Sequence, residues 1–244
     1  MALREELERQ GDWLFRWRSY LPLILIPILP FALRDTGNPM GYFYEVLCIT
    51  ISFIGLIIRC ITVGYVPEGT SGRNTKGQRA EILNTTGMYS IVRHPLYLGN
   101  FIISLGLVFF IQAWWFKIIT VLAFWLYYER IMFKEEEFLR KKFGDRYLEW
   151  SERTPAFLPR FKRWQKSVLP FSLKNVLKRE YPGFFGMIAS FTFLKTVKAI
   201  LYKKRLVLSL AWSILFIIGL VVYLTLRTLK KRTKVLDAVK GIVK

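Results

Sequence analysis

Long apolar blocks, rather than periodic apolar stripes, constrain most strongly what this chain of 244 residues can fold into. A helix on the surface of a soluble protein is apolar on one face, whereas a helix surrounded by lipid is apolar on all sides. We therefore expect an all-α integral membrane protein, with about five transmembrane helices plus a cytoplasmic region of short helices and loops. The apolar blocks stand at 13–33, 42–66, 98–110, 114–133 and 206–226.

The net charge of +20, from 37 basic and 17 acidic residues, agrees with this class. In a soluble protein such a charge would suggest nucleic-acid binding. Here the basic residues flank apolar blocks, where Lys and Arg face the cytoplasm and anionic lipid headgroups. We expect contacts with anionic membrane lipids and no nucleic-acid partner.

The distribution of basic residues also predicts the orientation of the protein in the membrane. Basic residues outnumber acidic ones strongly between Arg130 and Arg205, which places this segment in the cytoplasm by the positive-inside rule. The polar loop 67–93 lies on the same side, because a helical hairpin separates it from Arg130. We expect a bacterial inner-membrane protein whose polar loops meet on the cytoplasmic face.

The apolar stretch Gly183–Leu194 is too short for a simple span. We expect an interfacial or re-entrant segment here, with Lys195 and Lys198 reaching the interface. If the block 206–226 crossed alone, the basic tail would end outside, against the positive-inside rule.

We expect neither a metal site nor a nucleotide-binding site of the kind found in soluble proteins. One histidine and the two cysteines Cys48 and Cys60, both inside one apolar block, do not form a metal-ligand pattern. The segment Gly72–Gly77 resembles a phosphate-binding loop only superficially, because Gln78 and Arg79 follow it where Lys and Ser or Thr are required.

The only histidine, His94, stands in the motif Arg93-His94-Pro95-Leu96-Tyr97-Leu98-Gly99, where a polar loop meets an apolar run. The dipeptide His-Pro alone is typical of a capping or interfacial histidine, because proline suits the first turn of a helix. The longer string, which begins at Tyr89, is far more specific.

An acidic motif follows about forty residues later, at Glu135-Glu136-Glu137. Alone, these glutamates and the basic residues after them are also typical of a solvated helix face with ion pairs between neighbouring turns. Two ionisable clusters at the edges of membrane segments are costly, and that cost favours a functional site. The motif continues through Phe143-Gly144-Asp145-Arg146-Tyr147, Trp150, Pro155 and Pro159.

The two motifs in this order resemble the integral-membrane methyltransferases typified by isoprenylcysteine carboxyl methyltransferase and the phospholipid N-methyltransferases. The resemblance covers about residues 67–159. Two positions depart from the family pattern: Trp150 stands where a tyrosine is usual, and Glu81 where a histidine is usual. The second departure puts contacts at Glu81 in doubt.

The resemblance implies S-adenosylmethionine as the methyl donor and a lipid or lipid-linked substrate that enters from the bilayer. It implies catalytic roles for Arg130, holding an anionic substrate group, and for Glu135, orienting that group or the cofactor. An ordinary charged pair at a membrane boundary is the alternative for these two residues. The cofactor-binding residues it implies are Leu83, Tyr89, Arg93, His94, Pro95, Tyr97, Leu98, Gly99, Glu135 and Glu136.

The chain is expected to divide into three regions. Residues 1–66 are expected to form an N-terminal transmembrane hairpin. Residues 67–160 would be the catalytic methyltransferase core with two transmembrane helices. Residues 161–244 would be a basic C-terminal extension, with the interfacial segment and one further transmembrane helix.

The acceptor remains open between several chemistries. The basic cytoplasmic face favours an anionic lipid or a lipid phosphate, such as a lipid A-type glycolipid. Isoprenylcysteine carboxyl or phospholipid amine methylation are the alternatives within the family. Two other classes also stay open: an NADPH-dependent membrane sterol-type reductase, which shares a His-Pro-x-Tyr-x-Gly string, and a non-catalytic membrane scaffold.

Overall fold

The computed structural model describes residues 3–18, 20–34, 41–67, 80–204 and 208–237. Their secondary structure is helical, with no strand and a single isolated bridge between Gly87 and Gln165 in the described part of the chain. The predicted all-α class is confirmed. The α-helices are α1 (Leu3–Trp17), α2 (Leu29–Arg34), α3 (Tyr42–Gly64), α4 (Pro95–Ile111), α5 (Trp114–Phe143), α6 (Asp145–Arg153), α7 (Leu173–Lys203) and α8 (Leu210–Arg232).

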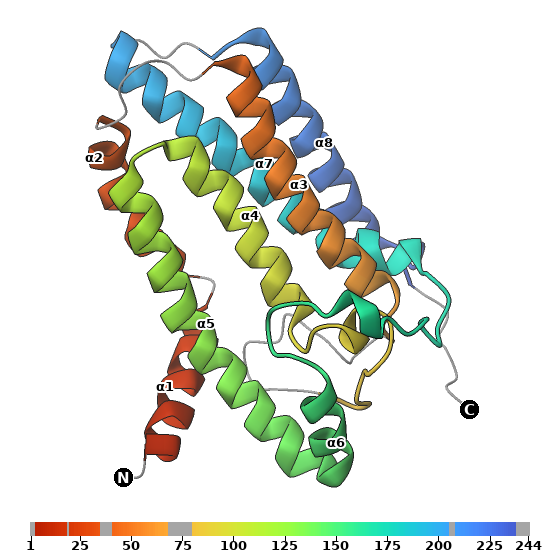
Figure 1. Ribbon diagram of the computed structural model, residues 1–244. Helices are drawn as coiled ribbons and strands as arrows, with labels where there is room; N and C mark the ends of the chain where they lie inside the picture. The colour runs from red at the N-terminus through yellow and green to blue at the C-terminus, as the bar shows by residue number, and fades with distance from the viewer. Residues whose placement is uncertain (1–2, 19, 35–40, 68–79, 205–207, 238–244) are drawn as a thin grey trace.

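Three of these helices are long and apolar enough to cross a membrane: Tyr42–Gly64, Leu173–Tyr202 and Leu210–Arg232. Two shorter apolar helices, Leu23–Arg34 and Pro95–Ile111, accompany them. Figure 1 shows α3, α4, α7 and α8 as an elongated bundle, with the long α5 extending beyond its lower end. The predicted membrane location is confirmed by these helices.

Small residues allow α3 and α4 to pack closely. A Cβ atom on Gly55 would lie 2.6 Å from the carbonyl oxygen of Gly99, and one on Gly99 would lie 2.8 Å from that of Gly55. Helices in a membrane gain much of their association from such close packing, because lipid provides no hydrophobic drive between them. This crossing fixes α4, whose first turn follows His94.

The predicted first span, Trp13–Leu33, is divided into three pieces. Helix α1 ends at Trp17, a 3₁₀ helix covers Leu21–Ile28, and α2 follows it. Prolines at 22, 27 and 30 remove backbone donors from this stretch, which disfavours a continuous α-helix. The amphipathic α1 instead packs against α5, where the Lys134 amine lies 2.9 Å from both Glu8 and Asp12.

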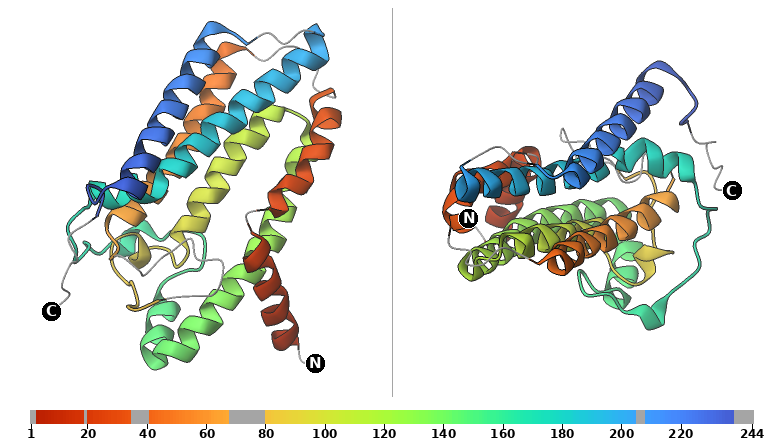
Figure 2. Two further views of the ribbon diagram at one scale, coloured as in Figure 1. Left: turned by 180° about the vertical axis from the view of Figure 1, so that it is seen from behind. Right: turned by 90° about the horizontal axis from the view of Figure 1, so that it is seen from above.

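The stretch Gly183–Leu194, where the sequence predicts an interfacial or re-entrant segment too short for a simple span, belongs to a longer helix. This stretch is the centre of the 31-residue helix α7, which continues through Pro182. The sequence pattern underestimates the length of α7 because the first turns of this helix are polar and do not extend the apolar block. Helix α8 runs back along α7, so the C-terminal end of α8 lies at the same end of the bundle as α6 (Figures 1 and 2).

Polar contacts join the start of α7 to the end of α3. The Ser172 backbone N–H donates to the Gly64 carbonyl oxygen at 2.8 Å, and the Asn175 side-chain amide donates to the carbonyls of Val63 at 3.1 Å and Val66 at 3.0 Å. These bonds satisfy carbonyls that the end of a helix leaves without partners. The C-terminal extension therefore packs directly on the predicted N-terminal region.

Candidate functional site

His94 lies at the junction between a loop and the first turn of α4. Its backbone angles, φ −120° and ψ 60°, are non-helical, and the buried Pro95 is the first residue of the helix. A residue before proline is kept out of the helical region by the proline ring. The His-Pro pair thus places His94 directly before the first turn of α4, outside the helical region.

The loop that carries His94 is held by the segment that follows α6. The Arg93 backbone N–H donates to the Pro155 carbonyl at 2.9 Å, and that of His94 donates to the Ala156 carbonyl at 3.2 Å. The indole of Trp150 donates to the Tyr89 carbonyl at 3.1 Å. The two sequence motifs are therefore bound to each other through backbone as well as side chains.

Helix α5 brings its acidic residues to His94 and Arg93. The His94 Nε2 atom lies 2.9 Å from Glu136 Oε1, and its Nδ1 atom lies 3.6 Å from Glu135 Oε2. The Arg93 Nη1 atom donates to Glu136 Oε2 at 2.8 Å. Glu137, one position further, points elsewhere and pairs with Arg4 of α1. We call His94, Arg93, Glu135 and Glu136 the charged cluster.

Burial and charge set the protonation states in this cluster. Burial alone would lower the pKa of His94, but the hydrogen bonds and charges of Glu135 and Glu136 raise it above its ordinary value of 6.5. Burial would raise the pKa of Glu136, but His94 and Arg93 hold it below 4.5. Both ring nitrogens of His94 face a carboxylate, which favours the doubly protonated imidazolium.

Aromatic rings form one wall beside the charged cluster. The Tyr97 ring stacks on that of His94, with centroids 5.6 Å apart, and its hydroxyl donates to Glu135. The Tyr128 ring lies 4.8 Å from the Tyr97 ring. Glu135 is therefore held by His94 on one side and by Tyr97 on the other.

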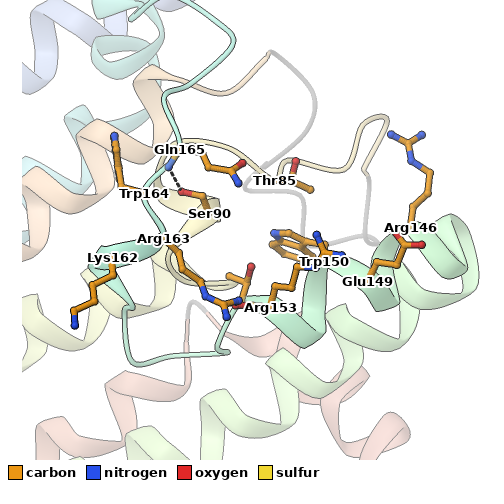
Figure 3. A pocket seen from close by; sticks show the side chains of 11 residues that line it. Thr85, Ser90, Arg146, Glu149, Trp150, Arg153, Lys162, Arg163, Trp164 and Gln165 are labelled. Atoms are coloured by element: carbon orange, nitrogen blue, oxygen red, sulfur yellow. Dashed lines mark hydrogen bonds between the residues drawn. The ribbon is translucent and has the colours of Figure 1, made fainter.

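A cavity of about 520 Å³ is lined in part by Trp150 and Ser90, and no residue of the charged cluster belongs to its lining (Figure 3). Figure 3 shows its lining coming from α6 on one side and from residues 162–165 on the other. The Trp150 ring also packs on the Tyr147 ring, whose hydroxyl lies 3.4 Å from Arg93 Nη1. The basic residues that line the cavity are Arg146, Arg153, Lys162 and Arg163, against the single acidic residue Glu149.

The predicted site residues do not all meet in one place. Leu98 is buried in an apolar group with Ile91 and Val92, and Gly99 lies at the crossing of α4 with α3. Leu83 is half-buried in the irregular segment before Gly87, and Tyr89 contributes its carbonyl to Trp150. Glu81 is exposed. The segment Gly72–Gly77 lies outside the described residues.

Arg130 lies on a different face of α5 from Glu135, since five residues correspond to about 140° around an α-helix. Its Nε atom donates to Gln10 of α1 at 2.8 Å, and its Nη1 atom donates to the Leu126 carbonyl at 2.9 Å. The structure thus places Arg130 at the contact between α1 and α5, and its predicted catalytic role stays a prediction.

Two tyrosines contribute to the site, Tyr147 and Tyr128, and the sequence analysis did not assign a role to either. Tyr147 reaches Arg93, and burial together with Glu136 raises the pKa of its hydroxyl. The Tyr128 ring packs against the Tyr97 ring in the aromatic wall. Tyr147 could have been assigned from the sequence because it belongs to the second motif. Tyr128 stands in an apolar run, where nothing in the sequence marks its hydroxyl as functional.

The arrangement suits a ligand with both positive and negative groups. Glu135 and Glu136 keep 28% and 25% of their side-chain surface exposed, so their carboxylates can meet a cation from outside the cluster. The Nε atom of Arg93 is buried and has no hydrogen-bond partner in the described part of the chain. It can therefore donate to an anionic group.

Comparison with known proteins supports a transferase relationship. Residues 46–146 match the family model described as phospholipid methyltransferase. The match reaches back into α3, further than the predicted resemblance, and ends within α6. The predicted similarity to the integral-membrane methyltransferases is confirmed. No solved structure matches the chain.

Curated relatives fall into two groups. The nickel-cobalt-cadmium resistance protein NccN of Alcaligenes xylosoxydans xylosoxydans is 29% identical over 146 residues, 59% of this chain and 63% of that protein. The cobalt-zinc-cadmium resistance protein CzcN of Cupriavidus metallidurans is 30% identical over 144 residues, 59% of this chain and 62% of that protein. Protein-S-isoprenylcysteine O-methyltransferase of Schizosaccharomyces pombe is 31% identical over 85 residues, 35% of this chain and 36% of that protein. The chain thus spans less than two thirds of the length of these relatives.

Proposed function

We propose that this chain, whose residues 46–146 match the phospholipid methyltransferase family model, transfers a methyl group from S-adenosylmethionine to a membrane-embedded lipid or lipid-linked acceptor. The observation that carries the proposal is the meeting of the two motifs, with His94 2.9 Å from Glu136 and Arg93 2.8 Å from the same carboxylate. A non-catalytic scaffold has no need for this paired charge at the edge of the membrane.

The residues present fit S-adenosylmethionine by their chemistry. That cofactor, when bound, supplies an electrophilic methyl group on a positively charged sulfur. Glu135 and Glu136 favour a positive charge nearby, and the buried Arg93 Nε is a free donor for the cofactor's carboxylate. The residues we assign to the cofactor are Leu83, Tyr89, Arg93, His94, Pro95, Tyr97, Leu98, Gly99, Glu135 and Glu136.

The adjoining cavity is the route we propose for the cofactor. Its volume of about 520 Å³ lies within the range of small-molecule sites. Its basic rim attracts a carboxylate, while the acidic pair attracts a cation at the other end of the ligand. Trp150 belongs to the cavity lining and is bonded to the loop of the first motif, so it links the cavity to the charged cluster.

The chain's own residues mainly position the reactants. Alignment of two bound reactants can lower a barrier by on the order of 7–11 kcal/mol at best. His94 and Tyr97 fix the carboxylate of Glu135, and Arg93 fixes that of Glu136. No residue needs to accept a proton when the acceptor is already anionic.

An anionic acceptor is the chemistry that the cluster favours. A phospholipid amine must lose a proton before it attacks, and the two carboxylates raise the pKa of His94, which disfavours the neutral imidazole that could accept this proton. A lipid phosphate, such as that of a lipid A-type glycolipid, needs no base, and the isoprenylcysteine carboxylate is the second candidate for the same reason. Arg130 would hold the anionic group of the acceptor.

We place the site on the cytoplasmic side of a bacterial inner membrane. The end of the bundle that carries the charged cluster also carries α6, the basic segment after it and the end of α8. Such an excess of Lys and Arg is typical of cytoplasmic loops and attracts anionic lipid headgroups.

A methyl-labelling experiment tests the acceptor class. Purified protein in lipid vesicles would receive S-adenosylmethionine labelled at the methyl group, with a lipid A-type glycolipid, a prenylated peptide with a free carboxylate, or phosphatidylethanolamine as acceptor. We expect label on the glycolipid phosphate. Label on the amine lipid alone would overturn the anionic assignment, and NADPH oxidation without label would favour a reductase.

A further inference from the structure

A buried ion pair joins the C-terminal helix α7 to α3. Arg59 of α3 binds Glu180 of α7 through two parallel bonds, from Nε to Oε2 at 2.8 Å and from Nη2 to Oε1 at 2.9 Å. The side chains keep 13% and 5% of their surface exposed. A pair of charges in this environment is costly unless every polar atom finds a partner.

The remaining nitrogen of Arg59 reaches α4. Its Nη1 atom donates to Asn100 Oδ1 at 2.6 Å and lies 3.4 Å from the Leu96 carbonyl. The side chain crosses α4 at Gly99, where a Cβ atom would come within 2.5 Å of Arg59 Cγ. Arg59 therefore contacts the first turns of the helix that begins directly after His94.

Hydrogen bonds and ring contacts continue from Asn100 to the charged cluster. The Asn100 amide donates to the Tyr128 hydroxyl at 3.0 Å. The Tyr128 ring lies 4.8 Å from that of Tyr97, whose hydroxyl donates to Glu135. A connected path therefore runs from Glu180, outside the family-matched residues, to one of the two cluster carboxylates.

We infer that Glu180 is a positioning residue for the methyl-transfer site, acting through Arg59 and Asn100 on the Tyr97–Glu135 contact. Glu180 fixes the guanidinium by binding two of its nitrogens, which leaves the third aimed at α4. The inference rests on the proposed function and gives the C-terminal extension a part in that function.

The path ends on Glu135 and does not touch the Arg93–Glu136 contact. Loss of Glu180 should displace the Glu135 carboxylate without removing its charge, so the rate of methyl transfer should fall more than the affinity for the cofactor. A small misplacement of reacting groups costs up to about 100-fold in rate. For Glu180→Gln we expect kcat to fall on the order of 10- to 100-fold, with the Kd for S-adenosylmethionine within about 3-fold of wild type.

The chain offers a matched control at the other end of the same helix pair. Glu45 of α3 pairs with Lys195 of α7, far along both helices from Arg59. Glu45→Gln removes an α3–α7 ion pair without touching the path to Tyr97. A role limited to holding the two helices together predicts equal effects of Glu45→Gln and Glu180→Gln.

A double variant separates positioning from charge neutralisation. Arg59→Met with Glu180→Leu removes both charges together, which is often tolerated in a protein interior. Activity should stay low in this variant, because Asn100 has lost its donor. Asn100→Ala leaves the ion pair intact and should lower kcat by on the order of 10- to 100-fold, so it tests the path even if Glu180→Gln fails to fold.

The decisive readout does not depend on methyl transfer. Fluorotyrosine placed at position 97 of the full-length protein in detergent reports its hydrogen bond to Glu135 by fluorine NMR, with Glu135→Gln identifying the signal of the broken bond. We expect Glu180→Gln, Asn100→Ala and the double variant to shift the signal towards that position, and Glu45→Gln to leave it unchanged. An unshifted signal in Glu180→Gln and Asn100→Ala, an equal shift in Glu45→Gln, or restoration by the double variant would overturn the inference. Absence of methyl transfer in wild type would count against the proposed function alone.

Discussion

The imidazole of His94 lies 2.9 Å from the carboxylate of Glu136, although 42 positions separate the two residues in the chain. His94 immediately precedes α4 and Glu136 stands in the polar half of α5, so the contact closes the hairpin that these helices form. Arg93 binds the second oxygen of the same carboxylate. The integrity of the charged cluster depends on this contact.

Glu136→Gln should weaken binding of S-adenosylmethionine. The substitution removes the charge that Arg93 and His94 share, and hydrogen bonds to charged groups contribute about 1.5–3 kcal/mol. We expect roughly 10- to 150-fold weaker binding by calorimetry. Glu137→Gln is the control, because that residue pairs with Arg4 of α1 instead. Equal losses in the two variants would contradict the site.

The stability contributed by His94 should depend on pH. Its raised pKa means that the contribution is fully present below about pH 6.5, the ordinary value, and is lost as pH rises through the folded-state pKa. Glu136, with a lowered pKa, contributes above pH 4.5 and loses its contribution as pH falls through its folded-state value. The difference in unfolding temperature between wild type and His94→Gln should shrink as pH rises above 6.5. A difference that grows with pH would disprove this assignment.

Gly99→Ala should destabilise the protein. The new Cβ atom would meet both the Gly55 carbonyl and Arg59 Cγ, and the end of the Arg59 side chain is held by Glu180. Overpacking of this kind costs about 1–3 kcal/mol. Gly186→Ala in α7, where a Cβ atom would meet nothing within 4 Å, should instead be neutral or stabilising by about 0.5–1 kcal/mol. Thermal unfolding in detergent measures both, and similar effects of the two changes would argue against the close crossing.

Arg130→Ala tests a role that the family resemblance implies and that geometry leaves open. If Arg130 holds the acceptor, kcat/KM for the lipid should fall while calorimetry gives an unchanged Kd for S-adenosylmethionine. Gln10→Ala removes only its partner on α1 and should leave the transfer rate near wild type. Loss of activity in both variants would show that docking of α1, rather than acceptor binding, is what Arg130 provides.

The all-α class and the two motifs of the site could be predicted because each depends on a short, continuous pattern in the sequence. Apolar blocks predict helices, and His-Pro predicts the start of one. The sequence does not reveal which of three consecutive glutamates faces His94, because that depends on the rotation of α5. In the structure Glu135 and Glu136 face the first motif and Glu137 faces α1.

Long-range partners explain the features that could not be predicted from the sequence. The start of α7 is polar because it binds the end of α3 through Ser172 and Asn175, so an apolar count alone finds too short a segment there. Arg59 stands in a predicted span and has no visible partner until α7 supplies Glu180. Contacts between residues so distant in the chain leave no periodic pattern.

Calorimetry of the detergent-purified protein with S-adenosylmethionine and with NADPH tests the proposed methyl transfer most directly. We predict saturable heat with S-adenosylmethionine, binding that is roughly 10- to 150-fold weaker in Glu136→Gln but unchanged in Glu137→Gln, and no heat with NADPH. Saturable binding of NADPH without binding of S-adenosylmethionine would contradict the proposal.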